Sequence, residues 1–267
     1  MKLVIVALSI VLIVELSIGT VTAHNKNITR VPEILKAPKP PKIDGDLFDW
    51  PLETSITGYQ TPDSKETAPS GGNPAPKEEE DFSFEMFAMW DANNMYFAGE
   101  VVDDEVELTN NSDKPWNHEA DWIELYMDPL YKGGGGRHIG ISFGIINEDE
   151  PVAYQSDPNE QICEDYDVAL AAADNLGPNK LPGWVYEARV GKKSWADSGI
   201  NLQADQKFGY LTIPGDQDSN ERKRIAWPPF ESINADNYAG LILSAKVARS
   251  SRAVTSAGKL ATAWAKL

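Results

Sequence analysis

The stretch FSFEMFAMWDANNMYFAGEVVDD, residues 82–104, decides the fold class of this chain. Apolar side chains occupy every second position from Phe82 to Trp90, which places them on one face of an extended strand. Residues 91–94, Asp-Ala-Asn-Asn, are typical turn formers, and a second strand-like segment runs from Met95 to Val102. The two segments and the turn between them predict a β-hairpin.

Six further segments resemble short strands separated by Gly and Pro clusters. They are Asp121 to Asp128, Arg137 to Asn147, Trp184 to Val190, Lys207 to Ile213, Lys223 to Trp227 and Gly240 to Val247. Helical periodicity is weak, and only residues 165–173 and the C-terminal end suggest it. Many short strands joined by polar turns predict an all-β fold, which we expect to be an immunoglobulin-like, jelly-roll-like antiparallel β-sandwich.

Residues 1–23 have the pattern of a cleaved secretory signal peptide. Lys2 precedes an apolar run from Leu3 to Leu16, and small residues at Val21 and Ala23 suit a signal peptidase. A retained membrane anchor is the alternative, but a bilayer span needs about 20 apolar residues and this run is shorter. We therefore expect cleavage after Ala23, a secreted protein in the extracellular space or periplasm, and no membrane association after cleavage.

The rest of the chain is expected to form one domain with extended flanks. Residues 24–41 are rich in Pro and Lys and predict an extended lead-in, residues 42–247 form the sandwich, and residues 248–267 form a basic tail. Within the domain, residues 61–81 combine prolines with an acidic run and predict a flexible surface loop.

The chain is strongly acidic, with a formal net charge of −17. Such a charge repels nucleic acids and anionic membranes at long range, whereas neutral ligands and cations remain suitable partners. Cys163 is the only cysteine, so no intramolecular disulfide can form. The stability of the fold must therefore come from its core or from bound metal.

Six segments, in this order, resemble the family 9 carbohydrate-binding modules. They are residues 41–50 (PKIDGDLFDW), 88–104, 116–128, 183–188 (GWVYEA), 216–227 and 238–243 (YAGLIL). The resemblance runs from about residue 41 to residue 245. It implies an immunoglobulin-like sandwich, bound calcium and a sugar held between aromatic rings near the end of a glycan. These modules usually accompany glycoside hydrolases, so it also implies a role in carbohydrate catabolism beside a hydrolase or within a cell-surface assembly.

The resemblance also implies a carbohydrate site. A sugar presents apolar C–H faces and a rim of hydroxyls, which aromatic plates and charged side chains can bind. Trp116 corresponds to the first plate, Glu124 to an acceptor of hydroxyl hydrogen bonds, and Arg222 or Arg224 to a donor. The full set of candidate sugar-binding residues is Trp116, Trp122, Glu124, Arg222, Arg224 and Phe230.

Strand alternation places Trp122, Glu124 and Tyr126 on one face of their strand. Phe230 is the candidate for the second plate, and Trp122 could replace Trp116 if the turn before Asp121 directs Trp116 away. In the alternative interpretation, the aromatic rings only cover the sandwich, while the charged groups are solvated.

Two acidic groups predict at least one calcium ion. Residues 216–220, DQDSN, place oxygen-bearing side chains at alternate positions, as in a calcium loop, and a second group lies beside the first hairpin. The candidate metal ligands are Asp103, Asp104, Asp121, Asp216, Asp218 and Asn220. A bound ion would stabilise an acidic chain that has no disulfide; solvated acidic turns are the alternative.

No nucleophile motif, phosphate-binding loop or histidine-rich metal site is found, so we expect no enzymatic activity. A haem-binding electron-transfer sandwich is the first alternative function; its axial ligands would come from His24, His118, His138 or the strand methionines. A structural or adhesion sandwich without a ligand is the second.

Overall fold

The computed structural model of the chain describes residues 28, 31–70, 76–109, 115, 120–134, 139–147, 150–195, 200–218, 221–230 and 233–249. The predicted signal peptide and nearly all of the predicted basic tail lie outside these residues. Among the described residues, no helix has the length and apolar character needed to cross a membrane.

The described residues form thirteen strands and four short 3-10 helices. The strands are β1 (Glu33–Lys36), β2 (Ala68–Pro69), β3 (Phe82–Trp90), β4 (Asn94–Asp103), β5 (Trp122–Asp128), β6 (Ile139–Ile146), β7 (Glu150–Asp157), β8 (Gln161–Ile162), β9 (Tyr166–Leu176), β10 (Leu181–Gly191), β11 (Lys207–Asp218), β12 (Glu221–Ala226) and β13 (Ala239–Val247). The helices are η1 (Leu47–Asp49), η2 (Leu52–Thr54), η3 (Lys192–Trp195) and η4 (Ala235–Asn237). Each strand predicted from the sequence corresponds to one of the observed strands.

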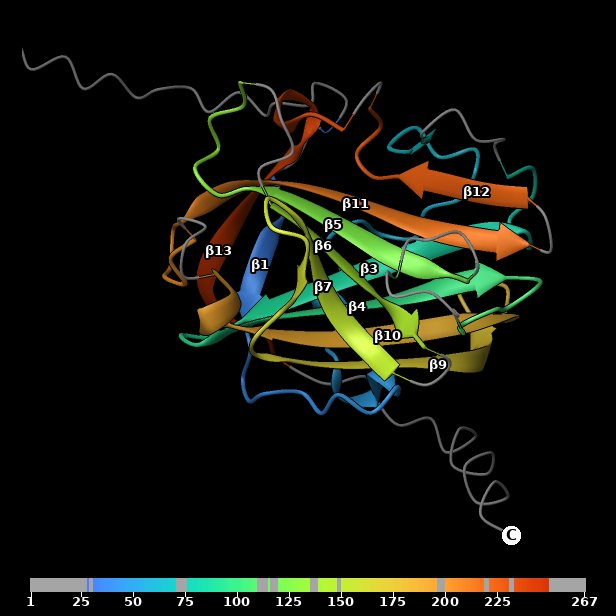
Figure 1. Ribbon diagram of the computed structural model, residues 1–267, viewed down its shortest axis with the longest axis horizontal. Coiled ribbons are helices and arrows are strands. Elements are labelled where there is room, and N and C mark those ends of the chain that lie inside the picture. The colour runs from blue at the N-terminus through green and yellow to red at the C-terminus, as the bar shows by residue number, and fades with distance from the viewer. Residues whose placement is uncertain are drawn as a thin grey trace, which may run out of the picture.

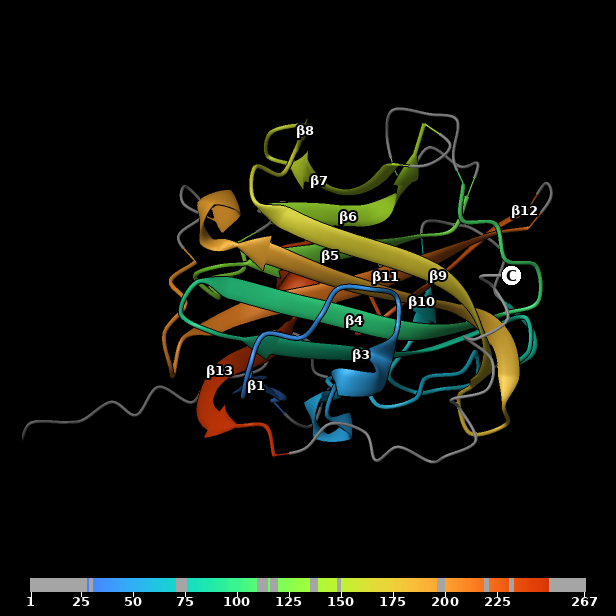
Figure 2. The same cartoon turned by 90° about the horizontal axis from the view of Figure 1, so that it is seen from below.

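The strands are arranged in two stacked layers (Figure 1). One layer has the order β8-β7-β6-β5-β11, and the other has the order β3-β4-β10-β9. β13 and β1 connect them at one side, so strand pairing is continuous from β8 to β9, as Figure 2 shows from below. The predicted all-β sandwich is confirmed.

One strand departs from the antiparallel arrangement. β1 pairs in parallel with both β13 and β3, and its Ile34 is completely buried. β1 lies within residues 24–41, where the sequence predicts only an extended lead-in before the domain. The four residues of β1 are too few to show an alternating apolar pattern. They form a strand because the edges of β13 and β3, on either side, offer backbone N–H and C=O groups that need partners.

Two other segments also differ from the sequence-based expectation. The described part of residues 61–81 is attached to the sheet, because β2 pairs with β12 and the Ser70 N–H donates to the Arg224 carbonyl at 3.1 Å. Residues 165–173, where a helix was an option, fall largely in β9, which pairs along its length with β10. Pairing with a neighbouring strand overrides the helical preference of the alanine-rich sequence.

The main core lies between the two layers and includes the predicted apolar face of β3, from Phe82 to Trp90. The outer face of β3, β4 and β10 is covered by the segment that holds η1 and Trp50 (Figure 2). The outer face of β5 and β11 packs against residues between β12 and β13, including Ala235 and Tyr238. Both outer faces are therefore covered by chain segments that connect strands.

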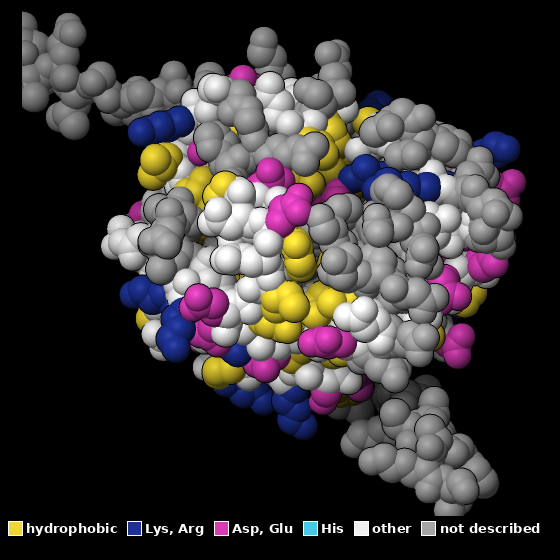
Figure 3. Space-filling view, in the orientation of Figure 1, with side chains coloured by type: hydrophobic (Ala, Val, Ile, Leu, Met, Phe, Trp, Pro, Cys, Tyr) yellow, Lys and Arg dark blue, Asp and Glu magenta, His cyan; other side chains and the backbone are white. Residues whose placement is uncertain are grey.

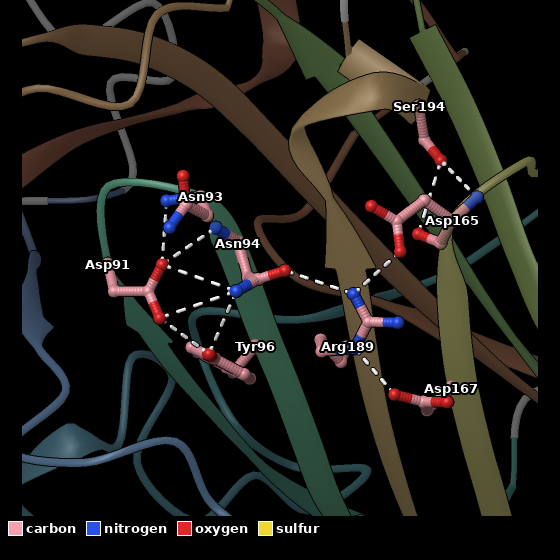
Figure 4. A network of polar contacts seen from close by, with 8 residues as sticks. All are labelled: Asp91, Asn93, Asn94, Tyr96, Asp165, Asp167, Arg189 and Ser194. Atoms are coloured by element: carbon pink, nitrogen blue, oxygen red, sulfur yellow. Dashed lines mark hydrogen bonds and ion pairs between the residues drawn. The ribbon is translucent and has the colours of Figure 1, made fainter.

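A polar network joins the predicted first hairpin to the neighbouring strands (Figure 4). In the turn, Asp91 Oδ1 accepts the N–H groups of Asn93 and Asn94 at 2.7 and 2.9 Å. Asn94 Oδ1 in turn accepts a hydrogen bond from Arg189 on β10, which also forms ion pairs with Asp165 and, on β9, Asp167. The turn chemistry expected from residues 91–94 is confirmed.

Candidate functional site

Six aspartates gather at one edge of the sandwich, where β4 and β11 end and β5 begins. We call Asp103, Asp121 and Asp216 the inner group; all three are buried, and they offer carboxylate oxygens within 4.8 Å of one another. These residues come from three distant parts of the sequence. They meet because β5 and β11 run antiparallel, which places the start of one beside the end of the other.

Hydrogen bonds orient two of the inner carboxylates. Asp103 Oδ2 accepts the indole N–H of Trp184 at 3.1 Å. Asp121 accepts the backbone N–H groups of Gln217 and Glu107 at 3.0 and 2.8 Å. A carboxylate oxygen has two lone pairs, so each retains acceptor capacity for a further ligand.

Asp216 has no such support. Its side chain is completely buried, and neither carboxylate oxygen accepts a hydrogen bond from a residue that the structure describes. Burial, reinforced by the neighbouring carboxylates, raises the pKa of Asp103, Asp121 and Asp216. Three buried carboxylates without a cation are unfavourable when ionised, because desolvation and mutual repulsion add.

We call Asp81, Asp104 and Asp218 the outer group; their oxygens also lie within 4.8 Å of one another, but they are more exposed. The Lys223 ammonium donates to Asp81 Oδ1 at 2.5 Å and to Asp218. It also lies 3.8 Å from Asp216 Oδ2 of the inner group. Lys223 therefore contacts both groups.

Carboxylate oxygens are ligands that a hard cation such as calcium prefers. The inner group fits this chemistry, because its three acids converge and the oxygens of Asp216 are otherwise without donors among the described residues. The structure thus brings together five of the six predicted metal ligands, Asp103, Asp104, Asp121, Asp216 and Asp218. Asn220 lies outside the described residues.

The predicted sugar-binding residues of β5 and β12 also form one cluster, on the outer face of the β5–β11 layer. Glu124 and Arg224 form a buried ion pair. Arg222 lies over the Trp122 ring, with its guanidinium carbon 4.6 Å from the ring centroid. The ring crosses Gly215 of β11, where a Cβ atom would approach it to 2.5 Å. Gly215 thus leaves room for the indole between β5 and β12.

The members of this cluster differ in accessibility. Trp122 is 0% exposed, and Glu124 and Arg224 are 5% and 8% exposed. Arg222 is half-buried. Its pKa is lowered to about 10, first by burial and then by the charge of Arg224. On the face drawn in Figure 3, basic side chains gather over β12, which carries Arg222, Lys223 and Arg224. A ligand that approached this face would meet Arg222 before the tryptophan beneath it.

Of the two residues predicted to stack on a sugar, Trp116 and Phe230, the structure describes only Phe230. Phe230 is half-buried and packs against the apolar cluster that contains Tyr126. Trp116 lies outside the described residues. The preceding residue, Pro115, is buried beside β6, since a Cβ atom at Gly144 would lie 2.9 Å from Pro115 Cβ and 3.7 Å from Trp122 Cβ.

A partly open cavity lies elsewhere in the described part of the molecule. A cavity of about 380 Å³ is found beyond the end of β5, and its lining includes Leu130, Gln155, Cys163 and Lys193. None of the predicted sugar-binding residues that the structure describes lines it. Burial raises the pKa of the Cys163 thiol to about 12, so the thiol remains protonated at neutral pH.

The described part of the chain offers little support for haem ligation. The four strand methionines, Met86, Met89, Met95 and Met127, are buried in apolar clusters. The Sδ atom of Met86 accepts a hydrogen bond from the Tyr186 hydroxyl at 3.3 Å. The three histidines lie outside the described residues. The methionines therefore have the surroundings of core side chains.

Sequence reasoning missed Asp81 and Lys223. Asp81 ends the acidic run at residues 78–81, which resembled part of a solvated loop, and Lys223 lay between two candidate arginines. Strand alternation could have identified Lys223 as different from its neighbours. In a strand, its side chain must point away from the face shared by Arg222 and Arg224.

Comparisons with known proteins give one sequence match and several structural ones. The family model described as "Carbohydrate family 9 binding domain-like" matches residues 64–135. No curated protein matches. A family 9 carbohydrate-binding module from Caldicellulosiruptor kristjanssonii, solved with cellotriose, is 16% identical, with a TM-score of 0.47, and the alignment covers 83% of this chain and 97% of the module. For the module solved with glucose the identity is 14%, the TM-score 0.49 and the coverage 84% and 99%. The match to the family model confirms, over residues 64–135, the resemblance to the family 9 carbohydrate-binding modules that the sequence motifs indicate.

Proposed function

We propose that this protein is a secreted, non-catalytic carbohydrate-binding module that binds a glycan or a glycan end and carries calcium. The observation that carries the proposal is the match of residues 64–135 to the family 9 carbohydrate-binding domain model, which spans β3, β4 and β5. Carbohydrate catabolism beside a glycoside hydrolase, or within a cell-surface assembly, is the corresponding role.

The sugar site is proposed on the outer face of β5 and β12. Arg222 is the accessible donor for sugar hydroxyls, and Trp122 supports its guanidinium from below. Glu124, which is ion-paired with Arg224, holds the position of that second guanidinium. Trp116 is proposed as the plate on which one sugar face stacks, with Phe230 as the candidate for the opposite side.

This arrangement changes the role proposed for Trp122. A ring that is 0% exposed cannot stack on a sugar unless the groups above it move. We therefore assign Trp122 to the support of Arg222, and Trp116 to stacking.

Calcium is proposed at the inner group of aspartates. The ion would neutralise Asp103, Asp121 and Asp216 and give the oxygens of Asp216 a partner. It would also fix the beginning of β5, where the sugar-binding face starts.

Calorimetric titration tests the sugar site, with cellotriose and glucose as the first probes, followed by a broad panel of short oligosaccharides. Trp116→Ala and Arg222→Met should each weaken binding about tenfold or more, because a stacked ring or a charged hydrogen bond contributes roughly 1–3 kcal/mol. Lys246→Met removes a charge from an exposed ion pair on β13 and serves as the control. If both site variants bind as tightly as the wild type, the site lies elsewhere.

A structural module without a ligand is the second candidate. The burial of Trp122, Glu124 and Arg224 favours it, because buried side chains can be retained for packing alone. The absence of binding across the whole panel would support this alternative.

A further inference from the structure

Lys223 is surrounded by carboxylates from both groups of aspartates. Its ammonium hydrogen-bonds to Asp81 and Asp218 of the outer group and lies 3.8 Å from Asp216 of the inner group. Among the described residues, it is the only lysine or arginine in ionic contact with the six aspartates. The pKa of Lys223 is raised, because these carboxylates outweigh the opposing effect of burial.

The backbone fixes this placement. Lys223 lies directly opposite Asp216 in the antiparallel β11–β12 pair, and the lysine is only 8% exposed. Its side chain is therefore confined to the space beside the end of β11. An ammonium is a compact point charge with three donors, so it can occupy a position among carboxylate oxygens much as a metal ion does.

The two groups thus differ in one respect. The outer group already has a cation at hydrogen-bond distance, whereas in the inner group Asp216 has two buried oxygens without hydrogen-bond donors among the described residues. We propose that the Lys223 ammonium is a built-in cation of the outer group, so that the aspartate cluster accepts one divalent ion, in the inner group. This inference rests on the proposed binding of calcium.

Removal of the ammonium should open a second ion position. In Lys223→Met, the outer group would have three carboxylates without a cation, which is the condition that favours a hard divalent ion. We expect this variant to bind one calcium ion more than the wild type. Without calcium it should unfold at a lower temperature than the wild type, and calcium should restore much of the loss.

Equilibrium dialysis with calcium alone measures the number of bound ions, and thermal unfolding with and without chelator gives an independent readout. Lys246→Met, which removes the same charge from an exposed ion pair, controls for the change in net charge and should bind as many ions as the wild type. In Lys223→Met/Asp104→Asn, the second change removes a carboxylate from the outer group only, and this double variant should lose the additional ion. Lys223→Gln provides the same comparison with a side chain that retains hydrogen-bonding capacity.

The outcomes separate this inference from the proposed calcium site. An equal number of ions in the wild type and both Lys223 variants overturns the inference, even if the wild type binds calcium. If Asp216→Asn binds as many ions as the wild type, the inner site is wrong. If Lys223→Met binds an additional ion that the Lys223→Met/Asp104→Asn double variant lacks, this result supports the role of Lys223, whatever Asp216→Asn shows about the inner site.

Discussion

The Glu187 carboxylate accepts a hydrogen bond from the Trp50 indole at 2.7 Å, and this contact joins two motifs that lie far apart in the sequence. The other oxygen of Glu187 accepts the backbone N–H groups of Asp44, Gly45 and Asp46 at 2.9, 2.6 and 3.2 Å. Gly45 makes this close approach possible: its φ is +81°, a conformation that side chains with a Cβ rarely adopt. The two motifs at residues 41–50 and 183–188 therefore contact each other through Glu187.

Glu187 should make stability depend on pH. Burial is the main cause that raises the pKa of Glu187 to about 7, whereas the pKa of a glutamate in an unfolded chain is about 4.3. Because the folded pKa is the higher one, protonation favours folding. This contribution is full below about pH 4, decreases as pH rises and is lost above about pH 7. It amounts to at most roughly 4 kcal/mol.

The test compares the wild type with Glu187→Gln by denaturant unfolding between about pH 4 and about pH 8, in saturating calcium. The free energy of unfolding of the wild type should decrease more steeply with pH than that of the variant. Parallel curves would show that Glu187 does not titrate in this range.

The effect of Asp216→Asn on stability should depend on whether calcium is present. In chelator, the variant should be at least as stable as the wild type, because it removes one of three mutually repelling buried carboxylates. In calcium, it should gain less stability than the wild type, because the ion loses a ligand. Differential scanning calorimetry under both conditions measures this, with the exposed Asp63→Asn as control. Equal shifts in the melting temperatures of all three proteins on addition of calcium would contradict the site.

The buried pair of Glu124 and Arg224 should show strong coupling. Replacement of one partner, by Glu124→Gln or Arg224→Met, should cost about 3–5 kcal/mol, since the remaining charge stays buried without its partner. The double variant should be more stable than the sum of the two single losses predicts. Denaturant unfolding of the four proteins completes the cycle; additive losses would indicate that the pair is solvated.

Asp91→Ala should destabilise the first hairpin by about 1–3 kcal/mol. The carboxylate accepts two backbone N–H groups of the turn and, at 2.6 Å, the Tyr96 hydroxyl. Tyr96→Phe removes only the last of these contacts and should cost less. Thermal unfolding ranks the two variants, and a larger loss for Tyr96→Phe would show that the turn contacts are the weaker ones.

The sequence predicts the cluster of aspartates better than the surroundings of the proposed sugar-binding residues, for a physical reason. Aspartates at the ends of predicted strands can be expected to lie close together, because antiparallel pairing places the start of β5 beside the end of β11. For the proposed sugar-binding residues, alternation assigns Trp122 and Glu124 to the outer face of β5, but it cannot reveal that the arginines of β12 cover them. Their burial depends on contacts between segments that are distant in the sequence.

The same distinction applies to the fold. The apolar alternation of β3 identifies a strand by itself, and the hairpin to β4 follows from the turn at Asp91. β1 and β9 carry no comparable local pattern. They are strands because β13, β3 and β10 present free edges to them, and such edges exist only in the folded protein.

The position of β1 between β13 and β3 has a consequence for biosynthesis. β1 is the first of the described strands to leave the ribosome and β13 is the last, and their pairing places Ile34 beside Leu243. Contacts between segments so far apart form late, since the intervening chain must be ordered first. The two layers therefore become joined through β1 only after β13 has been synthesised, and a chain that stops before Ala239 leaves β1 without its partner strand β13.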